Sequence, residues 1–204
     1  MDMTIAYAVN DGLYVNLTNR CPCSCAFCIR NNGDGAYGSD SLWLEREPDE
    51  KEIIEAVEKA GPGGFDELVF CGYGEPTERL DTLLNVARYV KTAYPDLPVR
   101  VNTNGLSDLI AGESTAGRFA GLVDTVSVSL NAANAEEYVA LCRPRFGAAA
   151  YQAMLDFAVE VSKHVPNVVM SVVNAPDRSE SQIDACRQVC SRLGLTFRVR
   201  QYVS

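Results

Sequence analysis

Three cysteines lie close together in the run TNRCPCSCAFCIR, where Cys21, Cys25 and Cys28 form the pattern C-x-x-x-C-x-x-C. Cysteine thiolates hold iron–sulfur clusters, and three of them can hold three corners of a [4Fe–4S] cube. The fourth iron then has no protein ligand within the run, so it can bind and activate a small molecule. Cys23 lies inside the same run, but its spacing of one residue from its neighbours suits a single cube poorly, so we interpret it as a non-ligand.

Cysteines also occur as buried core residues, zinc ligands and disulfide partners, so other readings of the run are open. Zinc sites usually pair C-x-x-C with a second, distant pair, and the only histidine, His164, lies in a helical pattern without neighbouring ligands. A zinc-stabilised binding protein remains an alternative. An iron–sulfur electron-transfer protein is a second one, and it would need a fourth ligand such as Cys23 or Cys71.

The cysteine spacing, with Phe27 directly before the last cysteine, resembles the signature of the radical S-adenosylmethionine (radical SAM) superfamily. The resemblance implies a [4Fe–4S] cluster on Cys21, Cys25 and Cys28 whose open iron is chelated by S-adenosylmethionine (SAM). Reductive cleavage of SAM would then give a 5′-deoxyadenosyl radical that abstracts hydrogen from a substrate. The runs LTNRCPCSCAFCIRNNGDG and LWLEREP are similar to a compact, TatD-associated group of this family.

Strand-like and helix-like segments alternate along the chain. The predicted strands are 12–17, 67–71, 98–103, 124–130, 167–173 and 196–202. The predicted helices are 48–60, 77–93, 113–120, 134–141, 147–164 and 179–193. This alternation predicts parallel β-α units, and six of them predict an α/β fold, a partial (βα)6 TIM-like barrel with outer helices. A closed eightfold barrel needs about 250 residues, so we expect residues 1–204 to form one radical SAM core domain with a side opening.

Polar and apolar residues alternate along several predicted strands. In one of them Val99 and Val101 alternate with Asn102 and Asn104. The apolar face should pack under the helices, which leaves the polar side chains inside the barrel. Unpaired buried polar groups cost about 1–3 kcal/mol each, so water, a cofactor or a substrate must fill the interior. The alternative is a sheet with one solvated face, which the intervening helices disfavour.

The run CGYGEPT follows the second predicted strand, and ligands of α/β folds bind at the carboxyl ends of strands. Alone, it is a turn before a helix. It resembles the family's GGE motif, which receives the amino group of SAM, with Tyr73 in place of a glycine. The resemblance implies cofactor contacts at Phe27, Tyr73, Gly74, Glu75, Asn102, Thr103, Asn104, Ser129, Asn131, Arg143 and Val173.

The last predicted strand carries Arg198, Arg200 and Tyr202, which we expect to line the barrel near its side opening. Arginines there would suit a substrate that bears a carboxylate or phosphate. The substrate can be a small molecule or a protein, and an activase-like reaction on a partner protein is an alternative. Flavodoxin or ferredoxin is the expected type of electron donor. Cys186 and Cys190 share a helix face, and we interpret them as buried packing residues rather than a second metal site.

Composition limits the cellular partners. A net charge of −9 argues against binding of nucleic acid or anionic membranes. No apolar run approaches the length of a membrane span, and the start MDMTIAYAVNDG does not have the pattern of a signal peptide. Eight cysteines without a secretory signal suit a reducing compartment, so we expect a cytoplasmic protein.

Overall fold

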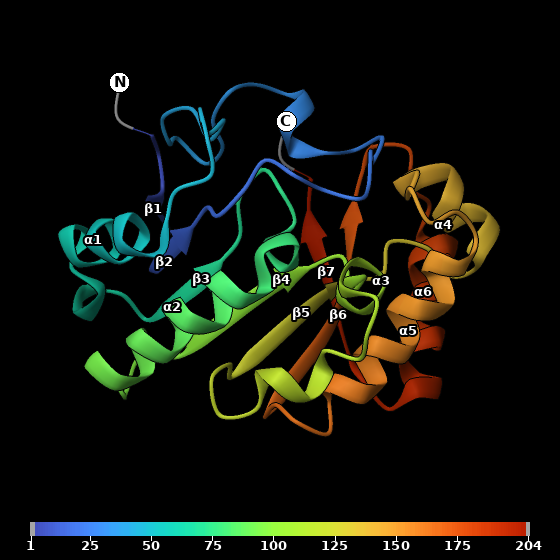
Figure 1. The fold of residues 1–204 in the computed structure, drawn as a ribbon. Coiled ribbons are helices and arrows are strands. Elements are labelled where there is room, and N and C mark those ends of the chain that lie inside the picture. The colour runs from blue at the N-terminus through green and yellow to red at the C-terminus, as the bar shows by residue number, and fades with distance from the viewer. Residues whose placement is uncertain (1–2, 203–204) are drawn as a thin grey trace.

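A computed structural model describes residues 3–202 and shows a curved sheet with strand order β1-β2-β3-β4-β5-β6-β7 (Figure 1). The strands β2 to β7 pair in parallel, each with the next along the chain, whereas β1 pairs with β2 in the antiparallel direction. The strands are β1 (Ala6–Val9), β2 (Gly12–Val15), β3 (Glu67–Phe70), β4 (Val99–Thr103), β5 (Thr125–Ser129), β6 (Asn167–Asn174) and β7 (Thr196–Gln201). Because β1 and β7 are the two edges of this order, the barrel is not closed, as the sequence predicted.

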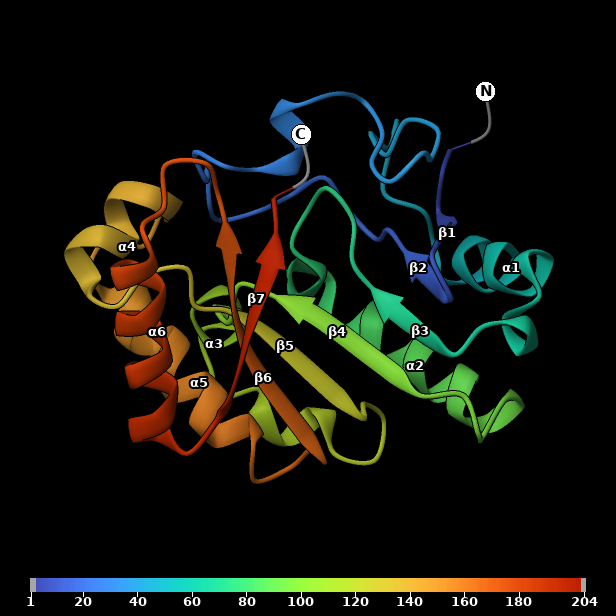
Figure 2. The same ribbon diagram turned by 180° about the vertical axis from the view of Figure 1, so that it is seen from behind.

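The helices α2, α3, α5 and α6 cover one face of the sheet, which Figures 1 and 2 show from opposite sides. The α-helices are α1 (Glu50–Ala60), α2 (Leu80–Ala93), α3 (Ser107–Ala111), α4 (Ala135–Cys142), α5 (Ala149–Val161) and α6 (Glu180–Leu193). Short 3-10 helices lie at Ile29–Asn31, Pro62–Gly64, Pro76–Arg79 and Ala116–Phe119. Under these helices the apolar side chains of the strands, such as Val101, Val128 and Met170, are fully buried. The alternation in the sequence thus predicted the core face correctly.

Two predictions about elements are wrong. The strand β1 was not predicted, and it forms a hairpin with β2 through a two-residue turn in which Asn10 adopts a φ of 50°. The continuous helix predicted at 113–120 is absent: α3 ends at Gly112, which has a φ of 72°, and residues 116–119 form only a 3-10 turn. The six predicted strands themselves are confirmed as β2 to β7.

Capping residues fix the starts of two outer helices. Asp49 and Glu52 form a capping box at α1, and Ser179 and Gln182 form another at α6. Each box satisfies backbone N–H groups that the first helical turn leaves unpaired. The two helices begin at Glu50 and Glu180, close to the predicted starts at 48 and 179.

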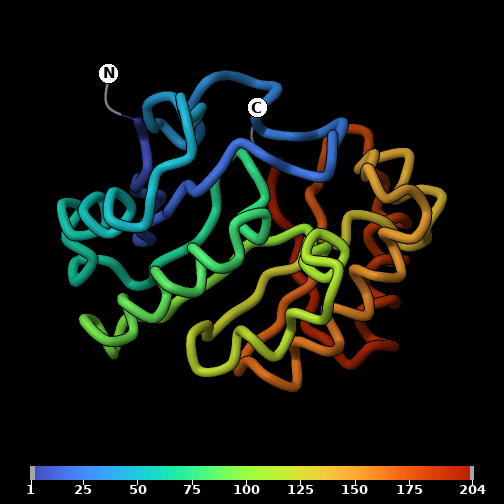
Figure 3. Tube along the Cα trace, viewed as in Figure 1, coloured from blue at the N-terminus to red at the C-terminus, as the bar shows by residue number. Residues whose placement is uncertain are grey.

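A long segment between β2 and α1 runs over the carboxyl ends of the strands, as the blue trace in Figure 3 shows. Side-chain hydrogen bonds fix it there. Asn16 Nδ2 donates to Leu42 O at 2.7 Å, and the hydroxyl of Tyr73 donates to Gly33 O, also at 2.7 Å. This segment contains the cysteine run, so the fold carries the thiols to the carboxyl ends of β2 to β7.

Candidate active site

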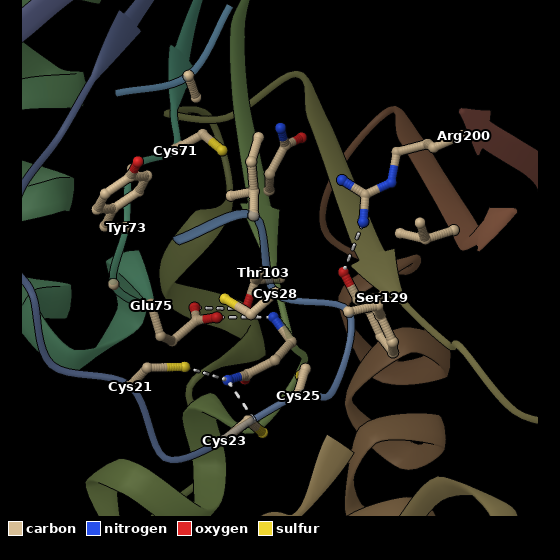
Figure 4. A pocket seen from close by; sticks show the side chains of 18 of the residues that line it. Cys21, Cys23, Cys25, Cys28, Cys71, Tyr73, Glu75, Thr103, Ser129 and Arg200 are labelled. Atoms are coloured by element: carbon tan, nitrogen blue, oxygen red, sulfur yellow. Dashed lines mark hydrogen bonds between the residues drawn. The ribbon is translucent and has the colours of Figure 1, made fainter. Parts of the chain in front are cut away.

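A cavity of about 230 Å³ opens at the carboxyl ends of the strands (Figure 4). Its wall combines the cysteine run, the turn after β3 and the ends of β4 to β7. The cavity is open to solvent at its mouth, so a ligand can enter it and extend beyond its enclosed part.

The cysteine run forms one wall of this cavity. Cys21, Cys25 and Cys28 line it and are partly exposed, whereas Cys23 is 3% exposed. Backbone hydrogen bonds fix the run against the end of α4, where Ser24 N donates to Cys142 O at 3.0 Å. The three thiols are thus held on a supported loop and face a space that a ligand can enter.

The arrangement of the thiols bears on which metal group they fit. Within residues 3–202, no three His, Cys, Asp or Glu side chains converge so as to hold a single metal ion. In a [4Fe–4S] cube each cysteine binds a different iron, so the sulfurs need not meet at one point. Three thiols spread around an open cavity fit such a cluster better than a tetrahedral zinc site.

A further cysteine, Cys142, lies beside this group, and its place there was not predicted from the sequence. Cys25 Sγ is 3.8 Å from Cys142 O, and Asn131 Nδ2 is 3.8 Å from Cys142 Sγ. Hydrogen bonds with the side chains of Cys142 and Cys23 hold the pKa of Cys25 below its usual value, while the pKa of Cys142 is raised. Cys25 is thus favoured as a thiolate, the form that binds iron.

Glu75 is a buried carboxylate at the base of the cavity, with 4% of its surface exposed. Its Oε1 accepts hydrogen bonds from Thr103 Oγ1 at 2.7 Å and from Thr77 Oγ1 at 2.8 Å. Its Oε2 accepts from the backbone N–H of Asn104 at 2.7 Å. Burial nevertheless raises the pKa of Glu75. Because a carboxylate oxygen can accept a second bond, Oε2 retains an acceptor site for an amino group.

Gly74 allows the turn after β3 to approach the cysteine run closely. A Cβ atom at this position would lie 2.2 Å from Thr18 O and 2.6 Å from Arg20 O. The neighbouring Glu75 N donates to Arg20 O at 2.8 Å. A glycine is therefore required where Glu75 and the cysteine loop meet.

The structure brings most of the predicted site residues to the cavity. The lining includes Phe27, Tyr73, Gly74, Glu75, Asn102, Thr103, Asn104, Ser129, Asn131, Val173, Arg200 and Tyr202. Two predicted residues lie outside it. Arg143 ends α4 with a φ of 46° and is exposed. Arg198 is exposed on β7, an edge strand, and is not among the residues that line the cavity.

Sequence reasoning missed several lining residues, among them Tyr7, Tyr37 and Cys142, and it considered Cys71 only as a possible fourth ligand of an electron-transfer cluster. Cys71 directly follows β3, so its place at a strand end was a usable signal. Tyr7 lies on β1, the strand that was not predicted, and its hydroxyl donates to Cys71 O at 3.1 Å. Tyr37 lies in the long segment over the strands, for which periodicity gives no position.

Thiols and a buried carboxylate that meet at the carboxyl ends of parallel strands define an α/β enzyme with a cofactor site. The comparison with known families agrees with this class. The model of the radical SAM superfamily matches residues 15–189, so the chain belongs to this superfamily. Membership of the TatD-associated group stays a prediction.

Curated relatives have similar sequences over part of their length. A GTP 3′,8-cyclase of Corynebacterium glutamicum is 31% identical over 174 residues, which cover 81% of this chain and 43% of that protein. A probable GTP 3′,8-cyclase of Methanosarcina acetivorans is 34% identical over 128 residues, covering 62% of this chain and 35% of that protein. The chain thus spans less than half of the length of these relatives.

Solved structures share the fold. Streptococcus suis SuiB bound to its precursor peptide SuiA superposes with a TM-score of 0.67 at 17% identity, over 97% of this chain and 40% of SuiB. Methylornithine synthase superposes with a TM-score of 0.63 at 14% identity, over 94% of this chain and 53% of that enzyme. In the part of the chain that the structure describes, no helix has the length and apolar character needed to cross a membrane.

Proposed function

We propose that the protein holds a [4Fe–4S] cluster through Cys21, Cys25 and Cys28 and binds SAM beside it. The observation that carries this proposal is the meeting of these thiols with the buried Glu75 around one cavity. When bound, the two cofactors supply reductive cleavage of SAM and a 5′-deoxyadenosyl radical that abstracts hydrogen from a substrate.

Different residues around the cavity would bind different groups of SAM and so orient it. Glu75 Oε2 accepts a hydrogen bond from the amino group. Thr103 and Asn104 lie beside Glu75 and would bind the carboxylate of SAM. Asn104 Nδ2 also lies 4.0 Å from Cys21 Sγ, so this side chain is close to the proposed cluster. Ser129 and Asn131 offer a hydroxyl and an amide to the ribose. We also propose that the backbone of Phe27, together with Tyr73 and Val173, contacts the adenine and methionine parts of SAM.

The chain also limits access of water to the site, which radical chemistry requires. Tyr73 is 4% exposed, and its ring packs edge-on against Trp43 with centroids 5.1 Å apart. On the opposite side Asn32 Nδ2 donates to the hydroxyl of Tyr202 at 3.1 Å. These contacts hold the long segment over part of the mouth, and the opening that remains is the route by which a substrate enters.

The comparisons support the cofactor chemistry and leave the substrate as a proposal. Relatives named GTP 3′,8-cyclase match over less than half of their length, and a SAM-bound SuiB structure shares the fold at 16% identity. The substrate, a small molecule or a partner protein, is unidentified. We further propose a flavodoxin or ferredoxin as electron donor, no nucleic-acid or membrane partner, and a reducing cytoplasm, which suits eight free thiols.

Anaerobic reconstitution with iron and sulfide tests the proposal. Single variants Cys21→Ala, Cys25→Ala and Cys28→Ala should lose the thiolate-to-iron absorption and the formation of 5′-deoxyadenosine from SAM and dithionite. Cys186→Ala, on α6 and outside the cavity lining, is the matched control and should retain both. Full iron content and turnover in Cys25→Ala would contradict the proposal.

The electron-transfer alternative is tested by the same preparation. It requires a fourth sulfur ligand, and Cys23 and Cys142 both lie beside Cys25. We expect Cys23→Ala and Cys142→Ala to keep the cluster and the cleavage of SAM. Loss of iron in either variant, together with no affinity of the wild type for SAM, would favour an electron carrier.

A further inference from the structure

Two arginines extend into the barrel, and their surroundings differ. Arg100 on β4 forms an ion pair with Glu67, with 2.6 Å between Nη2 and Oε1, and it donates to the hydroxyl of Tyr14 at 3.2 Å. Arg200 on β7 forms no ion pair within residues 3–202. Its hydrogen-bond partner there is the neutral hydroxyl of Ser129, 3.3 Å from Nη2. The Nε atoms of both arginines are buried and have no partner among the described residues, so the two arginines differ in the ion pair that Arg100 forms and Arg200 does not.

The missing counter-charge at Arg200 is informative. Arg200 is half-buried, and a guanidinium that is partly removed from water is stabilised by an opposite charge and by hydrogen bonds. The chain has 27 acidic and 18 basic residues, so carboxylates are in excess. The fold nevertheless places none of the described carboxylates against Arg200, although it lines the cavity. A bound anion would complete this position.

Neutral hydrogen-bond donors share the cavity with Arg200. Figure 4 shows its guanidinium pointing to Ser129, with Cys71 on another part of the wall. Burial raises the pKa of Cys71 and of Tyr37, so both side chains are held in their neutral forms. The thiol and the phenol therefore do not compete with an incoming anion for the charge of Arg200.

The position of Arg200 separates it from the cluster thiols. In Figure 4, Cys21, Cys25 and Glu75 lie together, and Arg200 lies apart from them beyond Ser129. On the proposed function, the residues beside the cysteines, with Glu75, would hold the amino and carboxylate groups of SAM. The charge of Arg200 is therefore left for a second molecule in the same cavity.

We propose that Arg200, whose guanidinium is positioned by its hydrogen bond to Ser129, binds the anionic group of the substrate, and that the substrate is an organic molecule carrying a carboxylate or a phosphate. The planar guanidinium offers parallel N–H donors, including the unpartnered Nε, and this geometry matches both oxyanions. This inference rests on the proposed function for the statement that the bound anion is the substrate.

The test uses the reconstituted protein under anaerobic conditions, with inorganic phosphate and acetate as separate probes. Ligand-observed NMR line broadening measures the affinity of each probe for the wild type, Arg200→Gln and Arg198→Gln. Arg198 is the matched control, because it lies on the same strand, loses the same charge and is exposed outside the cavity lining. The wild type and Arg198→Gln should bind at least one probe equally, and Arg200→Gln should bind it about tenfold or more weakly.

The preferred probe identifies the anionic group. If Arg200→Gln does not fold, Arg200→Lys replaces it and should still bind the preferred probe severalfold more weakly, because an ammonium lacks the planar fork. Equal affinity in the wild type and the Arg200 variant overturns the proposal. An equal loss of probe affinity in Arg200→Gln and Arg198→Gln would also overturn it. The proposal would fail as well if neither phosphate nor acetate bound to the wild type.

A second measurement separates this proposal from the proposed function. The affinity for SAM, measured by equilibrium dialysis, should be the same in Arg200→Gln and the wild type. Joint loss of SAM and anion binding would show that Arg200 holds the cofactor carboxylate, and it would overturn the substrate assignment. A wild type that binds the probe through Arg200 but forms no 5′-deoxyadenosine would instead overturn the radical SAM function and leave the anion site in place.

Discussion

The Glu75 carboxyl group combines burial with a cofactor-binding role, and this combination makes its titration measurable. Burial raises its pKa above the ordinary glutamate value of about 4.3. As pH falls through the raised pKa, Glu75 takes up a proton and Oε2 loses its charge. We expect the affinity for SAM to fall over this pH range, which lies above the ordinary titration of glutamate.

Equilibrium dialysis of the reconstituted protein with SAM at a series of pH values checks this prediction. The Glu75→Gln variant should bind SAM weakly and without this pH dependence. Without SAM, the free energy of unfolding has the opposite pH dependence. Because the pKa of Glu75 is raised in the folded protein, its stabilising contribution is present below the unfolded-state pKa and is lost as pH rises through the folded-state pKa. An unchanged pH profile in Glu75→Gln would assign the dependence to another group.

At the residue scale, the sequence predicted the positions of those site residues that lie close together in the chain or directly after a strand. Cys21, Cys25 and Cys28 lie within one loop, and Glu75 follows a strand directly. Cys142 reaches Cys25 across 117 positions of the chain. Its type alone is equally typical of a core residue, so only the packing of the end of α4 on the cysteine loop reveals its place.

At the scale of elements, the turn after β3 positions Glu75 only if it can pack on the cysteine loop. In Gly74→Ala the added Cβ would meet backbone atoms of Thr18 and Arg20, which cannot move as a flexible side chain does. We expect a loss of about 1–3 kcal/mol in the free energy of unfolding and reduced cluster loading. Denaturant unfolding and iron content measure the two effects.

Gly63→Ala is the control for this substitution, because its Cβ meets no atom within 4 Å and its φ lies outside the left-handed region. Its stability should equal that of the wild type or exceed it slightly, since alanine restricts the unfolded chain. Similar losses in both variants would show that the close approach at Gly74 is not the cause.

The strands β2 to β7 could be predicted because each lies next to a helical pattern. The strand β1 and residues 113–120 lack this signal. Each of β2 to β7 precedes or follows a helical pattern, so the change of period marks its bounds. The strand β1 instead pairs with β2 through a two-residue turn at Asn10 and Asp11, a hairpin signal within a run that has no helix. Gly112 ends α3 just before residues 113–120, and Gly117 lies within them, so only a short 3-10 turn forms there.

At the scale of the whole molecule, the alternation of elements predicted an open barrel but not what covers its mouth. The cover depends on pairs such as Asn16 with Leu42 and Tyr73 with Gly33, which join a segment of irregular structure to the strands. Such pairs leave no periodic pattern in the sequence. The same holds for the contact of Asn32 with Tyr202, which joins the loop that follows the cysteine run to the residue after β7.

The contact of Tyr202 with Asn32 holds the loop after the cysteine run against the residue that follows β7, over part of the mouth of the cavity, so it should limit access to the proposed cluster site. In Tyr202→Phe the hydroxyl is lost, and with it a hydrogen bond worth about 0.5–1.5 kcal/mol. We expect faster amide hydrogen exchange at residues 29–32 and faster bleaching of the cluster absorption in air, with global stability nearly unchanged. Tyr89→Phe is the matched control, because it removes a hydroxyl bonded to Glu58 at 2.9 Å between α2 and α1. Equal bleaching rates in the two variants would show that this contact does not protect the site.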